Sequence, residues 1–221
     1  MSAQHTTWRN WVAVTALGVG SFTIVTTELA PIGLLSAIGS DLGTPTSQAG
    51  LIVTLYAWIA VAAALFSAVV LSRVPRRPLL VILMLILALS SGVAAMAETF
   101  PALMGARVIG ALSHGAFWAM IGTVGAQLVP PNRVGLATSI IFGGVSAASV
   151  LGVPLANLIG TTEGWRGAFA SVAALSFAVA AVCFSTLPKL PGREGVGIAA
   201  MVRVLSNSRF LRIFAATVLA I

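Results

Sequence analysis

Six long apolar runs, separated by short polar segments, occupy most of this 221-residue chain. They cover residues 11–36, 48–71, 78–97, 102–128, 135–160 and 165–187. Each run reaches the roughly 20 residues that a helix needs to cross about 30 Å of hydrocarbon. The pattern therefore predicts an all-α membrane protein with six transmembrane helices.

The polar segment at residues 188–209 is longer than the others. It begins with Pro188, Pro191 and Gly192 and continues into an amphipathic stretch, which is typical of a linker with a surface helix. A last apolar run, residues 210–221, is too short to span a bilayer. We therefore expect a six-helix bundle over residues 1–187, a cytoplasmic linker over 188–209 and the truncated start of a seventh helix over 210–221.

Composition and charge agree with a membrane protein. Hydrophobic residues make up 58% of the chain and charged residues 8%, whereas a soluble domain has about 25% charged residues. If the helices alternate in direction, the basic residues fall on one side of the membrane, and the acidic residues Asp41, Glu98 and Glu163 fall on the other side with Arg166. The basic set is Arg9, Arg73, Arg76, Arg77, Arg133, Lys189, Arg193, Arg203, Arg209 and Arg212.

The positive-inside rule assigns the basic side to the cytoplasm, which predicts a cytoplasmic N-terminus. It also accounts for the net charge of +7 without nucleic-acid binding. Cys183 is the only cysteine, so no internal disulfide is expected, and we predict neither a metal nor a cofactor. Near the helix ends, Trp8, Trp11 and Trp165 are predicted to be interfacial anchors.

Two charged residues, Glu28 and Arg107, lie in the interiors of the apolar runs. An ionisable group at the bilayer centre costs at least about 2.5 to 3.5 kcal/mol, so such residues are candidates for function. Arg107, Ala111, His114 and Trp118 are spaced by four, three and four residues, which places them on one helix face. Glu28 lies at a similar depth on the first helix and can reach between Arg107 and His114.

This polar set has two interpretations. In one, Glu28 pairs with Arg107 as a structural bridge and His114 is a hydrogen-bonded core histidine. In the other, Glu28 or His114 takes up and releases a proton as a cavity opens alternately to each side. Arg107 keeps its proton and would serve as a counter-charge or bind substrate.

Further candidates for a substrate cavity are aromatic and polar residues of the apolar runs. Tyr56, Trp58 and Trp118 can stack against the apolar face of a sugar ring, and Thr27 and Asn157 can meet hydroxyl groups. Together with Glu28, Arg107 and His114 they form the predicted cavity.

Several segments match a known family in order along the chain. TTELAPIGLL at residues 26–35, followed by YAW at 56–58, resembles the sugar efflux transporters of the major facilitator superfamily. RRPLL at 76–80, SHGAFW at 113–118, LGVPL at 151–155 and GWR at 164–166 agree with the same family.

The resemblance implies a twelve-helix inner-membrane exporter that works by proton antiport and alternating access, with this chain as its N-terminal half. Such a half consists of two inverted three-helix repeats. Its partners would be a small sugar-like substrate, protons, membrane lipids, and the missing C-terminal half or a second copy. Drug, nucleoside or amino-acid efflux on the same fold, or a non-transporting assembly module, are the alternatives. No enzyme is expected, since an intramembrane protease would need a Gly-x-Ser-Gly motif and this chain has none.

The resemblance also assigns family motifs to individual residues. Arg107 resembles the arginine of the helix-four motif, and Gly152 with Pro154 resembles the helix-five antiporter motif, although a valine separates the two. The loop between helices two and three keeps the arginines, whereas Ser72 stands where most relatives have aspartate and Pro75 where they have glycine. The three loop arginines are Arg73, Arg76 and Arg77. We expect them either to bind anionic headgroups or to cap helix C-termini.

Overall fold

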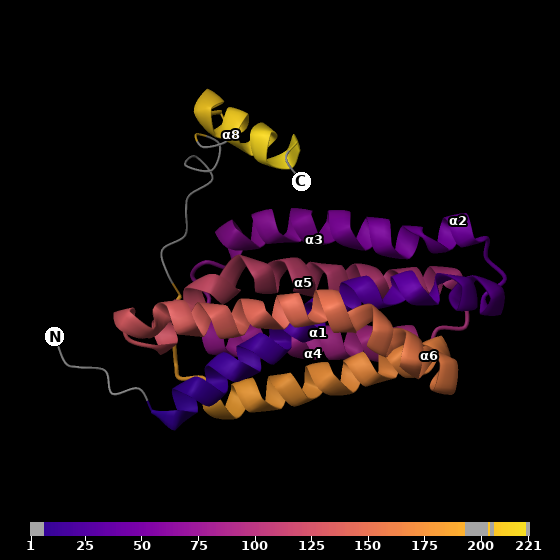
Figure 1. Ribbon diagram of the computed structural model, residues 1–221, viewed down its shortest axis with the longest axis horizontal. Helices are drawn as coiled ribbons and strands as arrows, with labels where there is room; N and C mark the ends of the chain where they lie inside the picture. The colour runs from indigo at the N-terminus through magenta and orange to yellow at the C-terminus, as the bar shows by residue number, and fades with distance from the viewer. Residues whose placement is uncertain (1–6, 193–202, 204–205, 220–221) are drawn as a thin grey trace.

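The computed structural model describes residues 7–192, 203 and 206–219, and its secondary structure over these residues is helical throughout (Figure 1). The helices are α1 (Trp8–Asp41), α2 (Thr46–Ala49), α3 (Leu51–Val70), α4 (Arg76–Ala95), α5 (Phe100–Leu128), the 3-10 turn η1 (Pro131–Arg133), α6 (Val134–Thr186) and α8 (Ser208–Leu219). The all-α prediction is confirmed. Most of the predicted amphipathic stretch after Gly192 lies outside the described residues.

Within the described residues, five helical segments are long and apolar enough to cross a membrane: α1, α2 with α3, α4, α5, and η1 with α6. The sequence predicted a turn at residues 161–164 between a fifth and a sixth helix, and α6 consists of two helical arms that meet at a kink in this region. Only Gly164, at φ 73°, leaves the helical region, and Figure 1 shows the ribbon reversing its direction within α6. The predicted turn is therefore present, and it needs only one glycine, which tolerates positive φ.

A polar cluster holds this reversal in place. Arg166 donates to Asp41 at the end of α1 over 2.5 Å and to the carbonyl oxygen of Ala97, just after α4, over 2.9 Å. The indole of Trp165 also donates to Asp41. Trp165 is only 4% exposed, so its predicted role as an interfacial anchor is wrong, whereas Trp8 is 72% exposed. Its burial follows from its position beside Gly164, where the turn directs it into the bundle.

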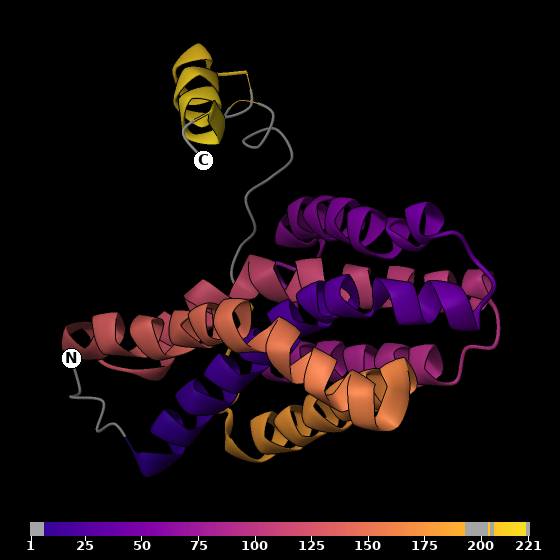
Figure 2. The ribbon, with the colours of Figure 1, turned by 45° about the vertical axis from the view of Figure 1, so that its right-hand side comes forward.

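The helices pack in pairs: α1 lies against α6, α3 against α5, and α4 against both α5 and α6, as Figures 1 and 2 show from two directions. Small residues permit the closest of these approaches. A Cβ atom on Gly115 of α5 would collide with the backbone oxygen of Ala60 and with Ala63 and Ala64 of α3. The close α3–α5 contact therefore requires a residue without a side chain at position 115.

Replacing Gly115 by alanine should destabilise the bundle by about 1–3 kcal/mol, the usual cost of overpacking. Gly122 is the matched control on the same helix, since a Cβ atom there meets no atom of the described residues within 4 Å. Gly122→Ala should be neutral or stabilising by up to about 1 kcal/mol. Denaturation of both variants in detergent micelles, followed by circular dichroism, measures the difference. Equal stability of the two variants would contradict the close α3–α5 approach.

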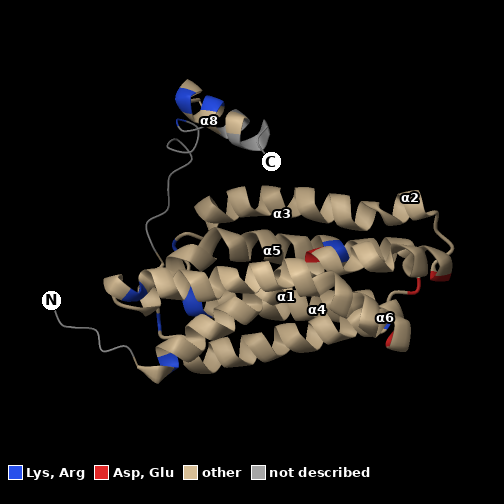
Figure 3. Ribbon diagram, viewed as in Figure 1, with Lys and Arg blue, Asp and Glu red and all other residues tan. Residues whose placement is uncertain are grey.

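Two large apolar clusters fill the bundle, one in each half of its length. The first contains Leu17, Met84 and Phe117, and the second contains Ile38, Leu103 and Phe169. Figure 3 shows basic residues at the end of the bundle beside the first cluster and acidic residues mainly at the opposite end. The separation of charge that alternating helices predict is therefore present in the fold.

Candidate functional site

The polar residues singled out in the sequence lie where the two apolar clusters meet. On α1, Glu28 falls between Ile24 of the first cluster and Ala30 of the second. On α5, Arg107 follows a residue of the second cluster, and His114 precedes one of the first. The site therefore lies near the middle of the bundle, where a membrane protein is farthest from water.

His114 is the centre of this site. Its Nδ1 lies 3.2 Å from the hydroxyl of Tyr56 on α3, and the Trp118 indole N–H donates to its Nε2 over 2.8 Å. Because Trp118 donates to Nε2, that nitrogen accepts, and the proton of a neutral ring is assigned to Nδ1, where it points to the Tyr56 oxygen. Helical spacing of four residues brings Trp118 to His114, whereas Tyr56 reaches it only through the α3–α5 contact.

Glu28 approaches the same ring nitrogen from α1. Its Oε2 lies 3.6 Å from His114 Nε2, beyond hydrogen-bonding distance but close enough for an ion pair with a protonated ring. The Glu28 side chain is 28% exposed and the His114 side chain 5%. Of the two, the carboxylate is therefore the group that water or a ligand reaches more easily.

Arg107 is buried at 3% exposure, and its guanidinium lies over aromatic rings. Its Cζ is 3.8 Å from the Tyr56 ring centroid and 5.7 Å from that of Phe169. The two ion pairs within 4.0 Å among the described residues are Glu28–His114 and Asp41–Arg166, so Glu28 does not bridge Arg107 directly. Arg107 Nε and Nη2 have no hydrogen-bond partner within the described part of the chain. Cation–π contacts thus stabilise the Arg107 guanidinium, while its Nε and Nη2 donors have no hydrogen-bond partner among the described residues.

In this geometry, Trp118 and Glu28 both approach His114 Nε2, and the protonation state of the ring decides which of them it can hydrogen-bond. A neutral ring accepts the Trp118 N–H there, but a ring protonated on Nε2 has no lone pair left and can only donate. The Glu28 carboxylate, 3.6 Å away, is an acceptor for that proton. Proton uptake at His114 would therefore exchange a hydrogen bond within α5 for a charged contact between α5 and α1.

Comparison with known proteins gives a match over residues 15–221 to the family model described as Major Facilitator Superfamily. The chain belongs to this superfamily. It is 31% identical over 213 residues to a probable sugar efflux transporter of Pasteurella multocida (strain Pm70), covering 96% of this chain and 53% of that protein. It is 36% identical over 212 residues to the uncharacterized MFS-type transporter YtbD of Bacillus subtilis (strain 168), covering 95% and 53%.

Solved structures of the same fold are similar to the chain. A bacterial homologue of the human lysosomal transporter Spinster, inward-facing and unoccupied, matches with a TM-score of 0.67 at 16% identity, covering 97% of this chain and 50% of that one. A D-xylose–proton symporter matches with a TM-score of 0.63 at 17% identity, covering 94% and 53%. The chain spans about half the length of the curated relatives it matches.

Membership of the Major Facilitator Superfamily, together with the apolar helices, identifies a multi-pass membrane protein of a family of transporters, which are not enzymes. Of the eight predicted cavity residues of this superfamily member, the fold brings five together: Glu28, Tyr56, Arg107, His114 and Trp118.

The other three predicted cavity residues lie elsewhere. The hydroxyl of Thr27 is buried and donates to the carbonyl oxygen of Thr23 in its own helix. Trp58 is 70% exposed, since it lies two positions after Tyr56 and so on another side of α3. Asn157 is exposed on α6 beside Gly33. The place of these three residues in one cavity with His114 therefore stays a prediction.

Two aromatic residues of α6 extend the site and were missed in the sequence. Phe142 lies 6.0 Å from Trp118 between ring centroids, and Phe169 contacts Arg107. Phenylalanines are common in lipid-facing runs, so nothing in the local sequence distinguishes these two. Only the packing of α6 on α1 and α5 brings them to the polar residues.

The loop arginines of this superfamily member bind the ends of neighbouring helices. Arg76 Nη1 donates to the carbonyl oxygen of Leu71 at the end of α3, and Arg77 Nη2 to that of Phe184 near the end of α6. Cations at helix C-termini are favourable because the last carbonyl groups carry partial negative charge. Arg76 and Arg77 thus make the predicted capping contacts, while Arg73 is exposed, and headgroup binding by these arginines stays a prediction.

The two residues assigned to the helix-five motif both lie in the first arm of α6. Gly152 is buried, and a Cβ atom there would come within 3.2 Å of the Thr26 hydroxyl on α1. Pro154 lies two residues later and is exposed. Gly152 therefore contributes to close α1–α6 packing.

Proposed function

We propose that this chain is the N-terminal half of a proton-coupled exporter of small sugars or sugar-like molecules that works by alternating access. In this proposal α6 crosses the membrane twice, around Gly164, so that six crossings form two inverted three-helix repeats. Residues 188–209 link this half to a second one, and residues 210–221 begin its first helix. We call the complete protein the two-half transporter.

The observation that carries the proposal is the Glu28–His114 contact at mid-depth, with Trp118 and Glu28 competing for one ring nitrogen. A transported proton needs a group that alternates between two stable environments, and this arrangement supplies two hydrogen-bonding states for one imidazole. The exchange also changes the attraction between α1 and α5. Protonation is thereby connected to helix packing, as coupling requires.

The choice of substrate rests on two further points. One similar protein is named a probable sugar efflux transporter, and the site combines aromatic rings with polar groups as a sugar site does. Trp118 and Phe142 would stack on the apolar face of the ring, while the unused Arg107 donors would meet a hydroxyl group.

The basic end of the bundle would face the cytoplasm, following the positive-inside rule. In the Cys183→Ser background, an impermeant thiol reagent added outside intact cells should label a cysteine at position 41 and spare one at 132. Both positions are exposed, at opposite ends of the bundle. The reverse labelling would overturn the orientation, and equal labelling after permeabilisation controls for reactivity.

Transport assays test the proposed function. Vesicles containing the two-half transporter, with an imposed pH gradient, should accumulate a labelled pentose or hexose and lose this ability when an ionophore collapses the gradient. The same vesicles should not move a nucleoside, an amino acid or a lipophilic cation. Gradient-driven movement of one of these compounds without sugar movement would replace the sugar assignment by the corresponding alternative.

A further inference from the structure

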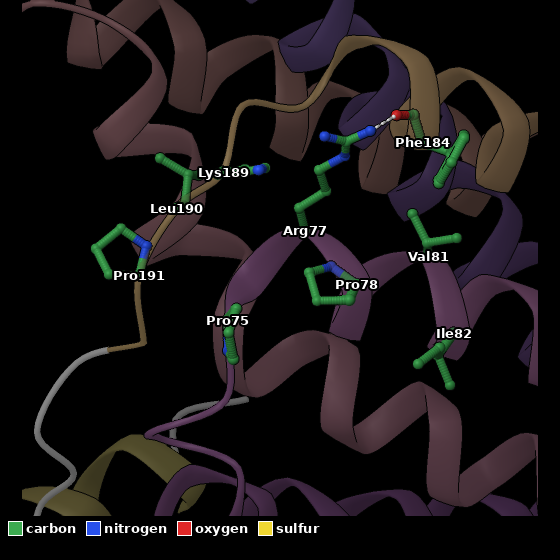
Figure 4. A pocket seen from close by; sticks show the side chains of 9 residues that line it. All are labelled: Pro75, Arg77, Pro78, Val81, Ile82, Phe184, Lys189, Leu190 and Pro191. Carbon is green, nitrogen blue, oxygen red and sulfur yellow. Dashed lines mark hydrogen bonds between the residues drawn. The ribbon is translucent and has the colours of Figure 1, made fainter.

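A second feature, remote from the Glu28–His114 site, is an apolar groove of about 740 Å³ at the basic end of the bundle (Figure 4). It lies between the first turns of α4 and the last turns of α6, and its walls include Pro78, Val81, Ile82 and Phe184. Ile82 is 50% exposed and Phe184 62%, so this groove opens toward the surface that faces lipid in a membrane.

Two cations line the same groove. Figure 4 shows the Lys189 side chain extending toward Arg77 at one end, while Ile82 lies farther along α4. Ile82 lies five positions after Arg77, which corresponds to about 7.5 Å along a helix. The groove thus changes from cationic at the bundle end to apolar toward the membrane interior.

Internal contacts preform the groove. The Arg76 backbone N–H donates to the Leu190 carbonyl oxygen over 3.0 Å, which fixes the chain after α6 against the start of α4. Arg77 donates to the Phe184 carbonyl oxygen over 2.6 Å, and its Cζ lies 5.0 Å from the Phe184 ring centroid. That hydrogen bond uses one of the five N–H donors of the guanidinium. A ligand would therefore meet existing walls and available donors.

We propose that this groove binds one anionic phospholipid, with its phosphate between Arg77 and Lys189 and an acyl chain along Val81 and Ile82. Charge complementarity selects this occupant, because basic pockets between membrane helices bind anionic headgroups. A free phosphate would leave the apolar walls empty, and a lipid without net charge would leave the two cations uncompensated. The binding concerns the lipid-facing side of the bundle and does not depend on which substrate the transporter moves.

The bundle contains a comparison groove. A cavity of about 400 Å³ between the start of α1 and the end of α6 is lined by apolar residues with Thr15 and has no charged side chain in its lining. Its walls include Val12, Val19 and Val182. Acyl chains should occupy this second groove without regard to headgroup charge.

Photolabelling tests the proposal on the 221-residue chain in phosphatidylcholine vesicles. Each preparation contains a trace of phosphatidylglycerol or phosphatidylcholine with a photoreactive acyl chain, and mass spectrometry locates the adducts. Phosphatidylglycerol should label residues 75–82 and 184–191 about 25-fold more than phosphatidylcholine, since Arg77 and Lys189 should each contribute a factor of about five near an anionic lipid. The Val12–Val182 groove should show no such preference.

Lys189→Gln should reduce the phosphatidylglycerol preference about fivefold and leave phosphatidylcholine labelling unchanged. Lys189 is exposed, so this variant keeps the Arg77–Phe184 contact, and circular dichroism checks its fold. Arg133→Gln is the matched control, because Arg133 is an exposed cation at the same end that does not line the groove. Equal labelling by both lipids, or an unchanged preference in Lys189→Gln, would overturn the proposal and indicate ordinary lipid solvation.

Discussion

Replacing Glu28 by glutamine in the two-half transporter is expected to reduce proton-driven sugar export at least about tenfold, the effect of losing only 1.4 kcal/mol of coupling. Glutamine has nearly the same shape but carries no exchangeable charge. The contact of 3.6 Å to His114 Nε2 would then no longer stabilise a protonated ring. Initial rates in vesicles with an imposed pH gradient measure the loss, and sugar binding without a gradient should survive.

Glu163→Gln is the matched control, since Glu163 is an exposed carboxylate on α6 at the acidic end. Its transport rate should equal that of the wild type at the same amount of protein. Gradient-driven export that is unchanged in Glu28→Gln would eliminate this carboxylate as the coupling group and assign coupling to His114. Loss of export in both variants would point to a general effect of removing negative charge.

The 221-residue chain by itself is expected to insert and form helices but to give no coupled sugar transport. Alternating access needs one helical bundle to move against another around a shared site. Glu28, Tyr56, Arg107, His114 and Trp118 all belong to one bundle, and the 12-residue α8 extends only about 18 Å, too short to span a bilayer. Circular dichroism should report helix, while sugar flux should equal that of protein-free vesicles.

Supplying the second half as a separate polypeptide is the positive control and should restore gradient-driven flux. The oligomeric state of the chain is measured in the same preparation, because a second copy can also cover the site. Saturable, proton-coupled sugar movement by the chain without a partner polypeptide would contradict the prediction. It would mean that two copies of this half build a working transporter.

Much of the fold was predictable from local sequence. An apolar run long enough to span a bilayer forms a helix whichever helices pack against it. The ends predicted for α1, α4 and α5 therefore fall within about five residues of those found. The reversal in α6 was predicted correctly as a turn ending at Gly164. A glycine with polar neighbours between two apolar runs is a local signal for a turn, so the sequence was sufficient to place it.

The candidate site was predictable only in part. Charge inside an apolar run singled out Glu28 and Arg107, and helical spacing joined His114 to Trp118. The partners across helices were not predictable. Arg107 lies on the Tyr56 ring instead of bridging Glu28, because the contact between α3 and α5 brings that ring within 3.8 Å of the guanidinium. The same contact leaves Trp58 on another side of α3.

The sequence by itself determined which segments are helices, which residues are costly to bury, and that basic and acidic residues separate to opposite ends. These properties follow from the length, period and polarity of short stretches of chain. The tertiary structure alone decided that Glu28 and Trp118 both approach His114 Nε2, that Phe142 and Phe169 join the site, and that Arg77 and Lys189 share one groove. Such pairings depend on helix crossing positions, which small residues such as Gly115 set by permitting close approach in three dimensions.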